Sequence, residues 1–131
     1  MQTRDSSLLA LRGDSLGELK SVISLEEAFQ NNTLRPILKL QNELLINLFI
    51  DYIKQQKNTF YSLNLDKKLT YIENAIQRDN SLRNVLKGIT IGLFTTDEYT
   101  EYLKNSSNLN KRMTGLIGER LKSQIQLLEH R

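Results

Sequence analysis

Residues 108–128 read NLNKRMTGLIGERLKSQIQLL, and this stretch decides the fold class. Its apolar side chains recur every three or four positions, the spacing that places them on one face of an α-helix. They are Leu109, Met113, Leu116, Ile117, Leu121, Ile125 and Leu128. Ser107 precedes the stretch and can cap its first turn. We therefore predict a long helix that buries this face against the rest of the chain.

The same spacing recurs through the chain upstream of this stretch. It predicts further helices at about 25–29, 34–56, 65–78, 82–93 and 96–103. Ser24 with Glu27, and Thr95 with Glu98, have the spacing of a capping box, and Pro36 suits a first helical turn. The connections are short, which favours antiparallel neighbours. The sequence thus predicts an all-α fold, a compact bundle of five or six helices with no sheet.

The chain has 131 residues, a length that fits one domain. Gly13 and Gly17 interrupt the helical pattern near the start, so we expect residues 1–23 to form a flexible N-terminal leader. Leu16, Leu19 and Val22 could still dock onto the domain. A single helical domain is expected at 24–129, followed by a tail at 130–131.

Composition excludes several classes of chemistry. The chain has no cysteine, which rules out disulfides and thiolate chemistry and suits the cytoplasm, where we expect the protein. Its one histidine, His130, lies next to the C-terminus, so we expect no metal and no histidine catalysis. No phosphate loop or dinucleotide motif is present, so no cofactor is expected. No uncharged run approaches the roughly 20 apolar residues of a membrane span, so no membrane partner is expected.

The helix expected at 34–56 carries a second apolar strip, formed by Ile46, Ile50 and Ile53. A helix with two apolar strips is buried on two sides. The second strip either packs inside the bundle, which we favour, or docks onto a partner such as a second copy of the chain. These three residues are therefore a candidate interaction surface.

Two glycines in the last helix form a second candidate surface. Gly115 and Gly118 share a strip with Lys111 and Lys122, opposite the apolar face. A glycine inside a helix costs about 1 kcal/mol relative to alanine. That cost suggests close approach by a second helix, which we favour, or by a phosphate backbone held by the two lysines; a helix weakened for no functional reason is the third reading.

Polar side chains cluster where two predicted helices begin. Arg35, Lys39 and Asn42 lie near the start of one, and Asn110, Lys111 and Arg112 near the start of the other. Free N–H groups and the helix dipole favour an anion at such a position. Capping and surface ion pairs explain the same residues equally well.

Part of the chain has a distinctive sequence. The run from Phe29 to Asn42, FQNNTLRPILKLQN, is one such part, and NSS at 105–107, LNKRM at 109–113 and ERLKSQ at 119–124 are others. Together they resemble a family of small uncharacterised all-helical proteins of Bacteroidetes, especially flavobacteria, over about residues 25–128. Some members carry the label "glyoxalase". Enzymes of that type use βαβββ modules and a metal held by His and Glu, and this chain has neither the strand pattern nor an internal histidine.

Three functions remain open from the sequence. The first is a non-enzymatic protein-interaction or structural module that could form a homodimer through the isoleucine strip. The second is an RNA- or ribosome-associated accessory protein, suggested by a net charge of +3 and a pI of about 9.2. The third is an enzyme using Asp97, Glu98 and Glu101, although acidic residues at a helix start more simply complement the helix dipole.

Overall fold

A computed structural model describes residues 3–13 and 24–129, and within these ranges the chain is helical with no strand. The all-α prediction is therefore confirmed. The helices are α1 (Arg4–Arg12), α2 (Leu25–Phe29), α3 (Arg35–Leu40), α4 (Asn42–Gln55), α5 (Leu65–Arg78), α6 (Asn80–Ile91), α7 (Thr96–Leu103) and α8 (Ser106–Ser123). Because α2 continues into α3, the described ranges contain seven helical segments, slightly more than the five or six expected.

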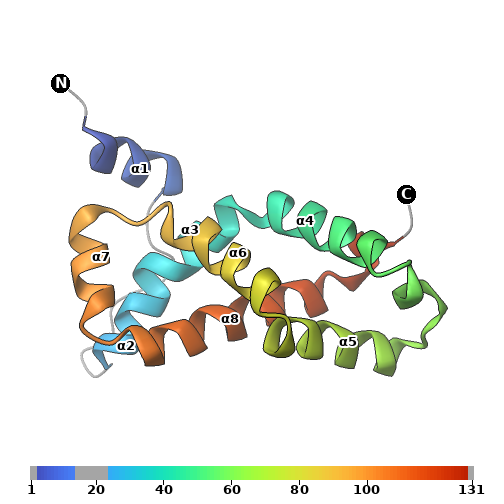
Figure 1. Cartoon of the computed structure of the whole chain (residues 1–131). Helices are drawn as coiled ribbons and strands as arrows, with labels where there is room; N and C mark the ends of the chain where they lie inside the picture. The colour runs from blue at the N-terminus through green and yellow to red at the C-terminus, as the bar shows by residue number, and fades with distance from the viewer. Residues whose placement is uncertain (1–2, 14–23, 130–131) are drawn as a thin grey trace.

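Helix α8 is the element around which the others assemble (Figure 1). Helices α4, α5 and α6 pack around one half of α8, and α7 and the α2–α3 segment pack around the other. Two short 3₁₀ segments complete the fold, Thr59–Ser62 before α5 and Ile125–Leu128 after α8, the latter lying against α4.

The core contains the predicted apolar face of α8. Leu109, Met113, Leu116, Ile117 and Leu121 are all buried there. They meet residues from every helix between α3 and α7, among them Leu34, Ile37, Leu38, Leu45, Phe49, Phe60, Ile72, Leu86, Phe94 and Tyr102. Burial of this apolar surface is the main stabilising contribution to the fold. None of the described helices is both long and apolar enough to cross a membrane.

The chain passes Pro36 without breaking the helix, contrary to the new helix start expected near Leu34. Residues Gln30–Leu34 form a π-helical turn, in which the Arg35 N–H donates to the carbonyl of Gln30. Proline clashes with the carbonyl four residues earlier in a regular α-helix, and a wider turn relieves this clash. The actual bend lies at Gln41, between α3 and α4.

Part of the expected N-terminal leader is a helix. Helix α1 begins at a capping box between Thr3 and Ser6 and buries Leu8 and Arg12. The pattern of apolar residues did not predict this helix, because α1 is attached to the rest of the molecule mainly by polar contacts. Residues 1–2, 14–23 and 130–131, including Leu16, Leu19, Val22 and His130, lie outside the described ranges.

Two helix starts differ from the expected caps. Helix α6 is capped by Asp79, which accepts from the Leu82 N–H at 3.0 Å, two residues before the expected Ser81. Helix α8 begins after Asn105 rather than after Ser107. Thr95 forms the full reciprocal box with Glu98, as predicted. At Ser24 only one half of the predicted box is present, in which the serine side chain accepts from the Glu27 N–H.

Candidate functional site

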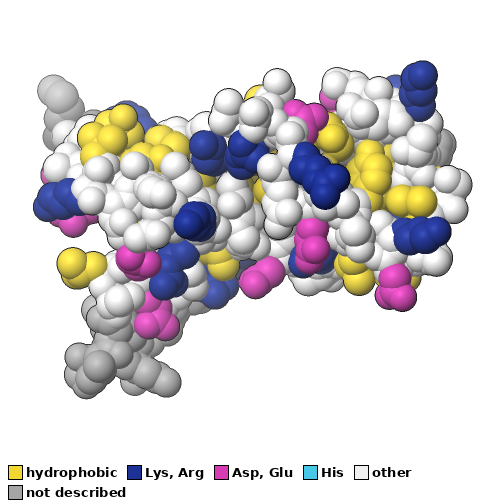
Figure 2. Space-filling view, turned by 60° about the horizontal axis from the view of Figure 1, so that its bottom comes forward, with side chains coloured by type: hydrophobic (Ala, Val, Ile, Leu, Met, Phe, Trp, Pro, Cys, Tyr) yellow, Lys and Arg dark blue, Asp and Glu magenta, His cyan; other side chains and the backbone are white. Residues whose placement is uncertain are grey.

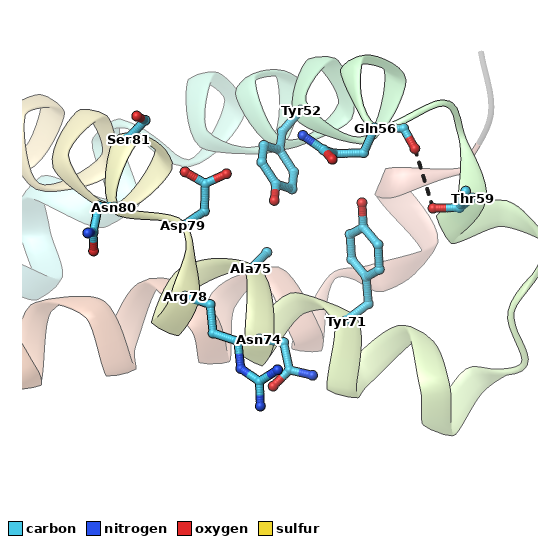
Figure 3. Close-up of a pocket in the computed structure, with 10 residues that line it drawn as sticks. All are labelled: Tyr52, Gln56, Thr59, Tyr71, Asn74, Ala75, Arg78, Asp79, Asn80 and Ser81. Carbon is cyan, nitrogen blue, oxygen red and sulfur yellow. Dashed lines mark hydrogen bonds between the residues drawn. The ribbon is translucent and has the colours of Figure 1, made fainter.

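A large open cavity lies between the C-terminal half of α4, the end of α5 and the start of α6 (Figure 3). Its volume is about 690 Å³, which is within the range of small-ligand and peptide sites. It is lined by Tyr52, Gln56, Thr59, Tyr71, Asn74, Ala75, Arg78, Asp79, Asn80 and Ser81.

Two tyrosines form the aromatic part of the cavity. Tyr52 on α4 and Tyr71 on α5 point their hydroxyl groups into it from opposite sides (Figure 3). Their ring centroids are 6.5 Å apart, and both rings also contact Phe49 of the core, at 5.5 and 6.4 Å. These contacts fix the rings and leave the hydroxyls facing the cavity.

Both tyrosines remain protonated at neutral pH. Burial raises the pKa of Tyr52 to about 12, and the negative charge of Asp79 adds to the effect. Burial also raises the pKa of Tyr71, against a smaller opposing effect of the Thr59 side chain. The two hydroxyls are therefore hydrogen-bond donors and acceptors rather than bases.

Asp79 supplies a fixed carboxylate at the edge of the cavity. It joins α5 to α6, and its Oδ1 accepts the Leu82 N–H as the cap of α6. In Figure 3 it lies on the Tyr52 side of the cavity, whereas Arg78 extends away along α5. A capping carboxylate is held rigidly, so it can accept a hydrogen bond from a ligand in a defined direction.

A smaller and more apolar cavity of about 280 Å³ adjoins the first. Tyr52, Gln56, Asp79 and Ser81 line both cavities. The second adds Leu48, Asp51 and Gln55 of α4 and Leu82 and Val85 of α6. We call the two together the tyrosine groove. Val85 is 51% exposed, and Leu44, one turn before Leu48, is 50% exposed.

The isoleucine strip proposed from the sequence is not a free surface. Ile46 and Ile53 are buried in the core, and Ile50 is half-buried against it. The isoleucine strip therefore packs inside the bundle, which is the alternative favoured from the sequence. On α4 the exposed apolar side chain is instead Leu44, on another face of the helix.

The glycine–lysine strip lines a groove of about 510 Å³ between α5 and α8. Lys111, Gly115, Gly118 and Lys122 all lie along it, as expected. Glu73 and Glu119 line it too, and the Lys122 Nζ lies 2.6 Å from Glu73 Oε1. The charges in this groove therefore balance, which does not favour a phosphate backbone there.

The other residues of the expected anion-binding surface do not form one surface in the structure. Asn110 accepts from the Tyr102 hydroxyl at 2.6 Å, and Arg112 reaches Gln30 at 2.9 Å and Glu26 at 3.4 Å, so both join α8 to its neighbours. Arg35 and Asn42 lie instead beside Arg120 of α8, and Lys39 is exposed one turn after Arg35.

Two of the three carboxylates considered for acid–base chemistry, Glu98 and Glu101, have structural partners. Glu98 is bonded by Arg12, Thr33 and Thr95, and Glu101 lies 2.8 Å from the Lys104 Nζ. Among the described residues, no three His, Asp or Glu side chains form a group that could hold a metal ion.

Sequence reasoning missed the tyrosine groove and Arg120. The tyrosines occur at apolar helical positions, a pattern that predicts core or boundary packing. That prediction fits their rings but says nothing of their hydroxyls. Asp79 directly before Asn80 and Ser81 was a cap signal that could have been found. No family model, no curated protein and no solved structure matches this chain.

Proposed function

We propose that the chain is a non-enzymatic protein-interaction module that binds a segment of a partner protein in the tyrosine groove. The groove supports this proposal because it combines fixed tyrosines with an adjoining apolar surface. Tyrosine is among the residues that supply most of the binding energy at protein interfaces, and the buried centre of such an interface is apolar. The Tyr52 side chain hydrogen-bonds to Asp79, and that of Tyr71 to Thr59. The remaining acceptor positions of these groups would pair with backbone N–H groups of the partner.

Binding rather than catalysis is favoured by the chemistry of the groove. Tyr52, whose pKa is raised to about 12 by burial and Asp79, stays protonated at neutral pH and cannot abstract a proton there. Asp79 already accepts the Leu82 N–H as a helix cap. The groove therefore offers recognition groups in fixed positions and no evident base or nucleophile.

A second copy of the chain is one partner that the proposal includes. With Ile46 and Ile53 inside the core, a homodimer would use Leu44, Leu48 and Val85 in place of the isoleucine strip. We also propose a cytoplasmic location, which rests only on the absence of cysteine.

RNA association receives less support. Figure 2 shows Lys and Arg side chains interspersed with Asp and Glu side chains over one face, without a continuous basic area. A nucleic-acid surface normally concentrates its basic residues on one face or along one helix.

Val85→Glu provides the direct test, with Leu103→Glu as its control. Val85 lines the groove, whereas Leu103 is a comparably exposed apolar residue at the end of α7. The immobilised proteins are compared for capture of partners from native cells by quantitative mass spectrometry, and for self-association by sedimentation. We expect Val85→Glu to reduce one specific interaction at least about tenfold, since a desolvated charge opposes docking. Equal behaviour of wild type and both variants in both measurements would reject the proposal.

A further inference from the structure

Another cavity, separate from the tyrosine groove, lies between α3 and α8. Its volume is about 390 Å³, and it shares no lining residue with the groove. Arg35 comes from α3, Arg120 and Ser123 from α8, and the buried Leu38 and Leu116 also line it. Two arginines thus face one small cavity from two helices.

Arg120 is held in position by neutral groups. Its NH1 donates to Asn42 Oδ1 at 3.2 Å. Asn42 and Gln124 exchange two side-chain hydrogen bonds, of 2.7 and 2.8 Å. This pair of amides orients the guanidinium without neutralising its charge, so the positive charge of Arg120 stays available to a ligand.

Arg35 is likewise bonded to a neutral partner. Its Nε donates to the Asn31 side chain at 3.2 Å. Within the described ranges, neither Arg35 nor Arg120 forms an ion pair with a carboxylate. Burial first, and then the positive charge of Arg35, lower the pKa of Arg120. Two like charges placed together repel one another, and an anion between them would relieve this cost.

The charge balance points to a dianion. Glu119 also lines the cavity, but Lys39 lies one helical turn after Arg35 on the same side of α3. Arg35 and Arg120 against Glu119 leave one positive charge in excess at the cavity itself, and Lys39, which does not line it, adds a second positive charge nearby. A phosphate monoester carries nearly two negative charges at neutral pH, and its oxygens suit the forked donors of arginine. A carboxylate would neutralise only one of the two charges.

We propose that this cavity binds the phosphate group of a small phosphorylated molecule. Arg35 and Arg120 hold the phosphate oxygens, and the remainder of the ligand lies over Leu38 and Leu116. The cavity is of the size that small ligands occupy. The site is independent of the proposed protein-interaction function.

The test is an NMR titration of the full chain with inorganic phosphate and with phenyl phosphate, at constant ionic strength set with chloride. We expect saturable shifts at residues 35–42 and 116–124 with both ligands, because both carry the phosphate group that the two arginines would hold. Arg35→Gln should weaken binding at least about tenfold, the loss expected when a charge-assisted hydrogen bond is removed. Arg35 is exposed, so this variant should fold normally.

Arg78→Gln is the matched control, because it removes the same charge from an exposed position on α5. Shifts that do not saturate, or that Arg35→Gln and Arg78→Gln reduce equally, would overturn the site. Single-stranded RNA is titrated in a parallel arm. RNA binding that depends on Arg35 but is not displaced by phenyl phosphate would overturn the small-molecule proposal in favour of a nucleic-acid contact.

Discussion

Helices α1 and α8 are attached to the molecule in opposite ways. Helix α8 buries Leu109, Met113, Leu116, Ile117 and Leu121 in the core. Helix α1 buries one apolar side chain, Leu8, together with the charged Arg12. Apolar burial tolerates small shifts because it has no direction, whereas polar attachment depends on exact partners. We therefore expect α8 to unfold only with the whole domain and α1 to detach by itself.

Arg12 is the centre of the polar attachment. Its side chain is 2% exposed, and it donates to both carboxylate oxygens of Glu98, at 2.6 and 2.8 Å. It also reaches the carbonyls of Leu93 and Asn32, at 3.4 and 3.5 Å. The Asn32 carbonyl lies four residues before Pro36, which has no N–H to donate to it. Because Pro36 cannot donate to the Asn32 carbonyl, this oxygen can accept a hydrogen bond from Arg12 of α1.

The surface of α1 adds further polar contacts. Arg4 donates to the carbonyls of Gly92 and Phe94, at 2.8 and 2.9 Å. Asp5 accepts from the backbone and the hydroxyl of Thr96 at the start of α7. All of these partners lie between α6 and the first turn of α7, so α1 closes over that connection.

The largest effect is expected from Ile117→Ala, because this substitution removes apolar contacts by which α8 is held in the core. Ile117 is fully buried in the middle of α8. Truncation leaves a cavity and should lower the free energy of unfolding by about 3 to 4 kcal/mol. Urea denaturation measures the loss. Hydrogen exchange should accelerate together in the helices from α3 to α8, whereas α1 exchanges through its own detachment and should change little. A loss of protection confined to α8 would contradict the role given to this helix.

A smaller and local effect is expected from Arg12→Met, which keeps the apolar stem but removes the charge. Glu98 then keeps only Thr33 and Thr95 as partners. We expect the docking of α1 to weaken by about 2 kcal/mol, which is less than the roughly 3 to 5 kcal/mol for breaking a fully buried ion pair because the Glu98 side chain is 18% exposed. Amide exchange in α1 should accelerate while α5 and α8 keep their protection. Lys54→Met, at an exposed position on α4, is the control and should change neither.

Acid should detach α1 through Glu98. Burial alone would raise the pKa of Glu98, but hydrogen bonds from Arg12, Thr95 and Thr33 hold it below the ordinary value of 4.5. A carboxyl group with a lowered folded-state pKa contributes its full stabilisation above 4.5 and loses it as the pH falls through the lowered pKa. The protection of α1 amides should therefore be constant above about pH 5 and decrease below 4.5.

Glu98→Gln isolates this contribution. Hydrogen bonds also lower the pKa of Asp5, which is bonded by Thr96, and that of Glu26, which is bonded by Asn105. The variant should weaken α1 docking at neutral pH and reduce its dependence on acid. An unchanged acid profile in Glu98→Gln would assign the effect to the other two carboxylates.

The same contrast explains what the sequence could predict. Helices α5 and α7 were located closely because their apolar positions repeat along the chain. Helix α8 was located too, but it ends at Ser123 rather than at Leu128, and a separate 3₁₀ segment follows it. Helix α1 was not, because Arg12 and Glu98 are 86 positions apart and no local pattern connects them. The tyrosine groove was missed for a related reason: Tyr52, Tyr71 and Asp79 come together only when α4, α5 and α6 pack. The glycine–lysine strip could be predicted as one surface because its four residues lie on one helix.

The smallest effects are expected at the two glycines of α8, where they report how closely α5 packs against α8. A Cβ at Gly118 would lie 3.5 Å from Cδ1 of Ile76 on α5, an ordinary contact, and one at Gly115 would meet nothing within 4 Å. Helix α5 does approach Gly118, as the sequence suggested, but it leaves room for a methyl group. Both Gly115→Ala and Gly118→Ala should therefore stabilise the fold by about 0.5 to 1 kcal/mol, through helix propensity. Thermal unfolding compares them with wild type. Destabilisation by Gly118→Ala alone would mean that α5 and α8 pack more closely than this contact indicates.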